Sequence, residues 1–101
     1  MARIKLGMVG GGNDAFIGGV HRIAARIDDR FELVAGALSS TPEKSAASAK
    51  DLGIPRSYGS FIEMAQAEAS HDNGIEAVSI VTPNHVHAAA AKAFLARGIH
   101  V

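Results

Sequence analysis

The chain lacks cysteine and tryptophan altogether, and aromatic residues make up only 5% of its 101 residues. The absence of cysteine excludes disulfides, zinc–thiolate sites and thiol nucleophiles, and it fits a reducing compartment. Net charge is absent too, because ten Lys and Arg balance ten Asp and Glu. No overall field therefore attracts nucleic acid or an anionic membrane. Because glycines and Asp14 interrupt the apolar run near the N-terminus, we expect a cytoplasmic domain without a signal peptide or membrane span.

What the chain does have is an alternation of short apolar segments with helix-like ones. The predicted strands cover residues 4–9, 31–38, 54–58, 75–81 and 99–101. The predicted helices begin after the glycine-rich segment, within residues 39–43, within residues 60–63 and after Asn84. This order predicts an α/β fold, a three-layer doubly wound sandwich around a parallel sheet. Ligands of such sheets bind beyond the carboxyl ends of the strands, where loops 10–18, 39–42 and 82–87 would meet.

The first predicted helix carries an apolar stripe at helical spacing. The stripe consists of Val20, Ile23, Ala24 and Ile27. Arg22 and Arg26 lie off this stripe. Such a pattern is typical of a helix that packs its apolar face on a core.

Glycines crowd the turn between the first strand and this helix. Gly10 and Gly12 supply the first half of the dinucleotide fingerprint G-x-G-x-x-G, and its third glycine is best assigned to Gly18, three residues late. Glycine permits the tight turn and a close approach of the backbone to a pyrophosphate. In the lengthened loop, Phe16 and Ile17 would offer backbone N–H groups to the phosphates. The alternative is a flexible connection without a ligand.

The second strand ends where an acidic residue would read the ribose of NAD(H). This chain has Ser39 and Ser40 there, with Lys44 one turn into the next helix. Two hydroxyls and an ammonium group tolerate a 2′-phosphate, so the pattern slightly favours NADP(H) over NAD(H). The alternative is that these residues merely cap a helix and face solvent.

The segment Thr82–Pro83–Asn84 ends the most strand-like part of the chain abruptly. Pro83 forces Thr82 into an extended conformation and suits the start of a helix. Thr82 or Asn84 would act as a cap, which is compatible with a contact to a cofactor. His85 and His87 have a metal-like spacing, but on a helix they point to different faces, so we expect no metal site.

Taken together, these motifs resemble the N-terminal domain of the Gfo/Idh/MocA oxidoreductases, the relatives of glucose–fructose oxidoreductase and inositol dehydrogenase. The resemblance covers nearly the whole chain, and its most specific part is the Thr-Pro-Asn-x-x-His segment. It rests on Gly10-x-Gly12, Gly18-x-x-His21, Phe-Glu-Leu-Val-Ala (31–35), Tyr58 with Phe61, Ile-Val-Thr-Pro-Asn-His-Val-His (80–87) and Ala-Arg-Gly-Ile-His-Val (96–101).

The resemblance implies a Rossmann fold that binds NAD or NADP, and hydride transfer to or from a sugar, polyol or related carbon. It implies that Gly10 and Gly12 line the pyrophosphate and that Ser39 and Ser40 line the adenosine ribose. Along the cofactor toward the nicotinamide it assigns Thr82, Pro83, Asn84 and His87. The chain departs from the family in its longer glycine loop and in Ser39, where many NAD-using members have an acid.

Family members continue into a Glu-Lys-Pro motif, whose lysine assists catalysis, and into a C-terminal substrate domain that usually forms the oligomer interface. Residues 1–101 stop before both, so we expect a nucleotide-binding domain of a homo-oligomeric parent enzyme. No catalytic residue is assigned within the chain, and the domain alone is expected to be inactive. Two alternatives stay open: a non-catalytic dinucleotide-binding or sensing module, and a Rossmann domain for another ligand such as S-adenosylmethionine.

Overall fold

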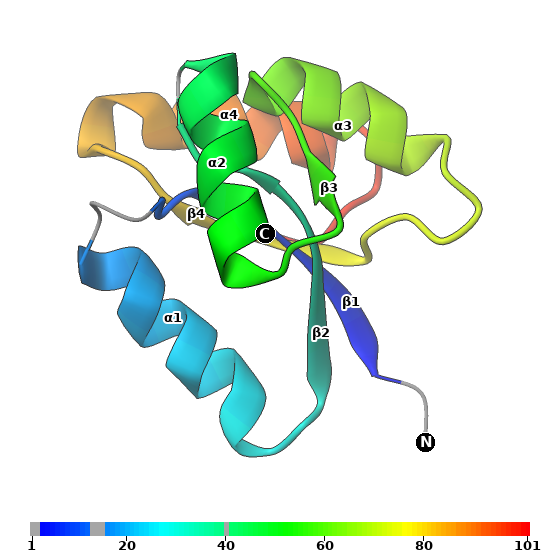
Figure 1. Cartoon of the computed structure of the whole chain (residues 1–101). Coiled ribbons are helices and arrows are strands. Elements are labelled where there is room, and N and C mark those ends of the chain that lie inside the picture. Colours follow the sequence, from blue (N-terminus) through cyan, green and yellow to red (C-terminus); the bar gives the residue numbers. More distant parts are fainter. Residues whose placement is uncertain (1–2, 13–15, 40) are drawn as a thin grey trace.

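Four parallel strands form one sheet in the order β3–β2–β1–β4 in the computed structural model of the chain (Figure 1). The structure describes residues 3–12, 16–39 and 41–101. The strands are β1 (Ile4–Gly10), β2 (Phe31–Ala37), β3 (Arg56–Ser57) and β4 (Ala77–Val81). The helices are α1 (Phe16–Ile27), α2 (Pro42–Leu52), α3 (Phe61–Ala69), the 3-10 turn η1 (Asn84–Val86) and α4 (His87–Leu95). The predicted doubly wound α/β fold is confirmed.

Strand β1 lies at the centre, because it pairs with both β2 and β4. Its partners run from Phe31 to Ala37 on one side and from Ala77 to Val81 on the other. A strand in this position is covered on both faces, which explains why it reads as a continuous apolar run. The predicted strand at 99–101 contributes a single parallel bridge, between His100 and Ala77.

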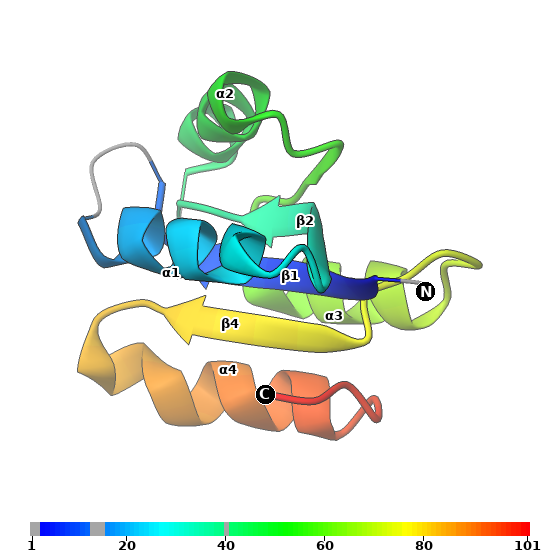
Figure 2. The same cartoon turned by 90° about the horizontal axis from the view of Figure 1, so that it is seen from below.

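Helices cover the sheet from both sides, with α2 and α4 on opposite sides in the view of Figure 2. The larger core lies under α3 and α4, which contact each other, and it includes the fully buried Met64 and Phe94. A smaller core lies on the α2 side and contains Met8, Leu38, Ala49 and Ile54. Most of the buried apolar residues therefore lie on the side of α3 and α4.

Local sequence signals set the ends of α2 and α3. Ser60 accepts a hydrogen bond from the Glu63 N–H at 3.2 Å and so caps α3. Gly53 ends α2 in the left-handed conformation, at φ 70°. At the start of α2, Thr41 occupies the N-cap position without a side-chain hydrogen bond.

The buried side of helix α1 is not the one that the sequence predicted. Of its predicted apolar stripe, Val20 is 44% exposed, Ile23 63% and Ile27 75%, and Ala24 is exposed too. Arg22, predicted to lie off the buried face, is only 8% exposed. The reason is a close contact between Gly18 and Gly11, which turns the Gly18 and Arg22 side of the helix toward β1.

A candidate dinucleotide cleft

The carboxyl ends of the strands open into one cleft of about 870 Å³. In Figure 2 the arrowheads of β2 and β4 point to the same side of the molecule, where the loops gather. The three predicted loops contribute to the cleft, and so does the loop between β3 and α3. The lining residues are Val9–Gly12, Ala37–Ser39, Lys44, Ala47, Ser48, Gly59–Phe61, Val81–Pro83, His85 and Val86.

The glycine turn has a conformation that only glycine adopts without strain. Gly10 and Gly11 have φ angles of 79° and 73°. A Cβ on Gly12 would lie 2.9 Å from the Leu38 carbonyl oxygen. A Cβ on Gly18 would run into the Gly11 Cα and lie 2.6 Å from the Gly11 oxygen. Gly18 thus has the packing role of the third fingerprint glycine, and the turn is packed too closely for side chains at these positions.

The end of β2 is held by a buried hydroxyl. Ser45 Oγ accepts a hydrogen bond from the Leu38 N–H at 3.0 Å and donates to the Tyr58 carbonyl at 2.7 Å. Ser39 follows directly, and its Oγ accepts from the Thr41 N–H at 3.3 Å. Ser39 and Lys44 both line the cleft, so its wall at the end of β2 carries a hydroxyl and a cation.

A hydrogen bond from an imidazole holds the loop after β4. His87 Nε2 lies 2.8 Å from the Thr82 carbonyl oxygen, so it is the protonated ring nitrogen and donates to that carbonyl. The Thr82 hydroxyl donates to the Pro83 carbonyl at 3.2 Å. Because Pro83 has no N–H and a fixed φ, here −55°, the chain leaves the sheet at once and enters η1.

These features are those of a dinucleotide-binding βαβ fold, and residues 4–101 match the Gfo/Idh/MocA family, described as an oxidoreductase family with an NAD-binding Rossmann fold. The chain belongs to this family.

Three relatives illustrate the Gfo/Idh/MocA match. An oxidoreductase from Sinorhizobium meliloti is 71% identical, with a TM-score of 0.95, over 100% of this chain and 28% of that one. An inositol dehydrogenase homologue from Azotobacter vinelandii, solved with NAD+ and with NADH and myo-inositol, is 42% identical, with a TM-score of 0.94. That match covers 98% of this chain and 26% or 27% of the homologue. Uncharacterized oxidoreductase YfiI from Bacillus subtilis is 40% identical, over 97% of this chain and 26% of that protein. The chain spans about a quarter of the length of these relatives.

Six of the predicted site residues come together in the cleft of this Gfo/Idh/MocA domain. They are Gly10, Gly12, Ser39, Lys44, Thr82 and Pro83. Asn84 and His87 do not line it; His87 acts on the cleft through the Thr82 carbonyl. Phe16 and Ile17 lie at the start of α1, with side chains outside the described part of the structure. Ser40 lies outside the described residues.

Sequence reasoning missed the wall made by the loop after β3. Ser60 and Phe61 line the cleft from this loop because β3 lies next to β2 in the sheet. The signal was present in the capping box at Ser60, which marks a helix start at the carboxyl end of a strand. His85 also lines the cleft, whereas the family motif drew attention to His87.

A buried ion pair holds this wall to the rest of the fold. Glu68, with a fully buried side chain, accepts two hydrogen bonds from Arg56 at 2.8 and 2.7 Å and one from the Tyr58 hydroxyl at 2.5 Å. Burial opposes ionisation of Glu68, but the hydrogen bonds from Arg56 and Tyr58 outweigh it and keep the pKa of Glu68 below its ordinary value. Burial, and then the carboxylate of Glu68, raise the pKa of Tyr58 to about 12.

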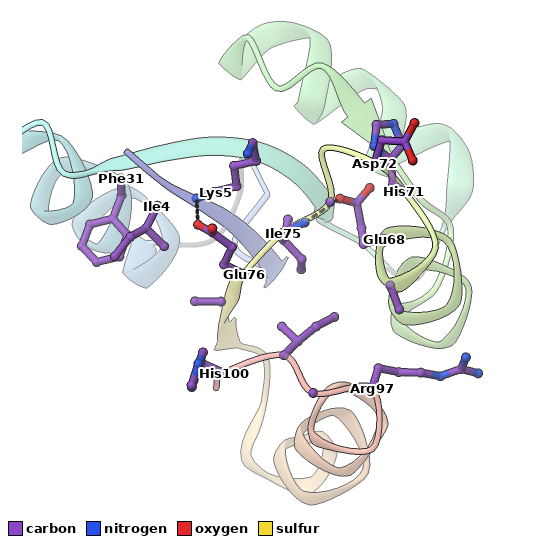
Figure 3. A pocket seen from close by; sticks show the side chains of 15 residues that line it. Ile4, Lys5, Phe31, Glu68, His71, Asp72, Ile75, Glu76, Arg97 and His100 are labelled. Atoms are coloured by element: carbon purple, nitrogen blue, oxygen red, sulfur yellow. Dashed lines mark hydrogen bonds between the residues drawn. The ribbon is translucent and has the colours of Figure 1, made fainter. Parts of the chain in front are cut away.

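A second cavity, of about 800 Å³, lies at the amino ends of the strands, away from the glycine turn (Figure 3). Two of its carboxylates, those of Glu68 and Glu76, serve the fold. Glu76 accepts from the Lys5 N–H at 2.9 Å, and Glu68 accepts from the Ile75 N–H at 3.2 Å, as the dashed lines in Figure 3 show. These bonds tie neighbouring chain segments together.

Within residues 3–12, 16–39 and 41–101, no three side chains of His, Cys, Asp or Glu gather as metal ligands. Over the same residues no helix has the length and apolarity needed to cross a membrane.

Proposed function

We propose that the carboxyl-edge cleft binds a nicotinamide dinucleotide, as the cofactor-binding part of a dehydrogenase that acts on an inositol or related polyol. The observation that carries the proposal is the glycine turn. Gly10 and Gly11 have positive φ, and Gly11 and Gly18 are in close contact. This arrangement places the first turn of α1 against the glycine turn that lines the cleft, and the first N–H groups of a helix attract an anion. The Azotobacter homologue, which was solved with NAD+, supports the choice of ligand.

Each predicted residue receives a role along the cofactor. Backbone groups at Gly10 and Gly12, and the first N–H groups of α1 at Phe16 and Ile17, face the pyrophosphate. The adenosine ribose lies against Ser39, Ser40 and Lys44. The nicotinamide half lies against Thr82, Pro83 and Asn84, while His87 holds the Thr82 carbonyl in place.

The cofactor is NAD(H) by likeness to the inositol dehydrogenase homologue. Two features extend the proposal to NADP(H): Ser39 stands in place of an acid, and Lys44 lines the cleft beside it. A 2′-phosphate would gain a charge-assisted partner there and would meet no carboxylate.

Bound nicotinamide supplies the hydride acceptor or donor for interconversion of an alcohol and a ketone. The residues of this chain bind and orient it. We assign the proton transfer and the polyol contacts to residues beyond these 101, as the resemblance to the full-length family implies. The same resemblance implies a homo-oligomeric parent enzyme, which we propose is cytoplasmic. Binding without turnover is therefore expected of the 101-residue chain.

Titration calorimetry of the chain with NADH, NADPH and S-adenosylmethionine tests the proposal. Both nicotinamide cofactors should bind, and S-adenosylmethionine, which has no pyrophosphate, should not. Addition of myo-inositol to the NAD+ complex should leave the nicotinamide absorbance unchanged. Failure of both dinucleotides to bind refutes the cofactor site, and polyol-dependent reduction by the purified chain refutes the assignment of catalysis to other residues.

A further inference from the structure

Arg22 is a buried cation directly behind the glycine turn. Only 8% of the residue is exposed, although it lies on a helix whose isoleucines 23 and 27 face solvent. Its Nη1 group donates to the Gly11 carbonyl oxygen and lies 3.7 Å from the Met8 sulfur. Among the described residues, no salt bridge includes Arg22. A guanidinium kept from water in this way loses hydration free energy, which a charged or hydrogen-bonding partner has to offset.

The contact with the Gly11 carbonyl determines how the next peptide group points. In a planar trans peptide, the C=O of Gly11 and the N–H of Gly12 project from opposite edges. Holding the carbonyl toward Arg22 therefore directs the Gly12 N–H away from it. Within residues 3–12, 16–39 and 41–101 no hydrogen bond engages this N–H, and Gly12 lines the cleft. A turn of three glycines would otherwise rotate this peptide at little cost.

We infer that Arg22 is a positioning residue for the pyrophosphate of the dinucleotide, which holds the Gly11–Gly12 peptide with its N–H toward the cleft and adds a fixed positive charge behind the turn. The inference rests on the proposed function. Burial, and then the neighbouring Arg26, lower the pKa of Arg22, as expected of a cation held away from water. A pyrophosphate in the cleft would offset both effects, because it brings negative charge to the other side of the same peptide.

Three substitutions separate the hydrogen bond from the charge. Arg22→Met keeps an unbranched chain and removes both, Arg22→Gln keeps a donor without charge, and Arg22→Lys keeps the charge. Arg26→Met is the matched control, because it removes the same charge from an exposed position one turn further along α1. We expect Arg22→Met to weaken NADH binding about tenfold or more, as loss of a charged hydrogen-bond partner does. Arg22→Gln and Arg22→Lys should each recover part of this loss.

Ligand dissection provides a readout that a merely structural role would not move. Arg22→Met should weaken the binding of ADP, which carries the pyrophosphate. It should leave the affinity for adenosine within about twofold, since adenosine has no phosphate to contact the turn. Equal losses of affinity for ADP and for adenosine would overturn the inference. An Arg22→Met protein that binds NADH as tightly as the Arg26→Met control would overturn it too.

Amide NMR of the unmodified chain decides the matter if Arg22→Met fails to fold. The Gly12 amide resonance should shift strongly on addition of ADP and little on addition of adenosine. If the chain binds NADH but the Gly12 amide resonance does not shift on addition of ADP, the role of Arg22 is overturned and the proposed cofactor site is retained. A chain that binds neither NADH nor NADPH refutes the proposed function itself.

Discussion

Replacing Glu68 by Gln tests how the wall of the cleft is held. Gln keeps nearly the volume of Glu but loses the negative charge, and it no longer offers two carboxylate oxygens to Arg56. The Tyr58 hydroxyl and the Ile75 N–H would have to share the single amide oxygen. All of this happens at a side chain with no exposed surface.

The magnitude follows from burial on each side of the pair. Removing one partner of a buried ion pair costs about 3–5 kcal/mol, because the other charge stays desolvated. The Arg56 side chain is 25% exposed, so water can rehydrate it in part, and we place the loss at the lower end, about 3 kcal/mol. In a domain of this size 1 kcal/mol corresponds to about 4–8 °C, so the melting temperature should fall by roughly 12–24 °C.

Urea unfolding followed by far-ultraviolet circular dichroism measures this loss. The control is Glu63→Gln, at an exposed position of the same helix, which should change stability by less than about 0.5 kcal/mol. A Glu68→Gln protein within about 1 kcal/mol of the parent would refute the reasoning, since it would mean that the ion pair merely balances its own desolvation.

The same network predicts that the stability of the chain decreases at both acid and alkaline pH. The pKa of Glu68 is lowered by folding, so its stabilisation is present above the unfolded value of about 4.3 and is lost as the pH falls through the lower folded value. The pKa of Tyr58 is raised to about 12, so its contribution holds below the unfolded value of about 10 and is lost as the pH rises toward 12. Tyr58 is the single tyrosine, so its ultraviolet titration is direct. A pKa near 10 in the folded chain would contradict this account.

The remaining predictions concern the cleft and helix α1. Ser39→Asp should raise the ratio of NADPH to NADH dissociation constants by about tenfold or more, through repulsion of the 2′-phosphate. An unchanged ratio in calorimetry would show that this position does not meet the ribose. Gly18→Ala should destabilise the chain by about 1–3 kcal/mol and weaken NADH binding, because its Cβ would meet the Gly11 backbone. Gly19→Ala, whose Cβ would lie no closer than 3.7 Å to Arg22, should instead stabilise it by about 0.5–1 kcal/mol, and equal denaturation midpoints for the two would contradict this assignment. The exposed stripe of α1 should cause self-association, which Ile23→Lys should reduce in sedimentation, and identical profiles for parent and variant would argue against it.

Sequence periodicity and breakers were enough for the order of elements. Apolar runs bounded by glycine and proline marked the strands, and Ser60 and Gly53 marked helix ends through hydrogen bonds and φ values that belong to local sequence. The alternation of strand and helix then determined a parallel sheet, because a right-handed crossover is the usual way to join parallel neighbours. The same logic predicted the edge at which the glycine turn, Ser39 and Thr82 meet.

Tertiary structure decided which side of α1 is buried. Periodicity shows that a helix has an apolar side but does not show what that side faces, and here Ile23 and Ile27 face outward. The contact between Gly11 and Gly18 is too close for any Cβ, so it sets the rotation of the helix and carries Arg22 inward. The fingerprint singles out Gly18 in the sequence, but no local signal shows which side of the helix its contact with Gly11 buries.

The sequence by itself thus determined the fold class, the family and six residues of the cleft. Only the tertiary structure brought the loop after β3 into the wall and joined Arg56, Tyr58 and Glu68 into one buried group. The physical reason is that hydrogen-bonding and apolar patterns along a chain specify local conformation. Burial, and the pairing of charges that burial requires, depends on which distant segments the sheet order makes neighbours.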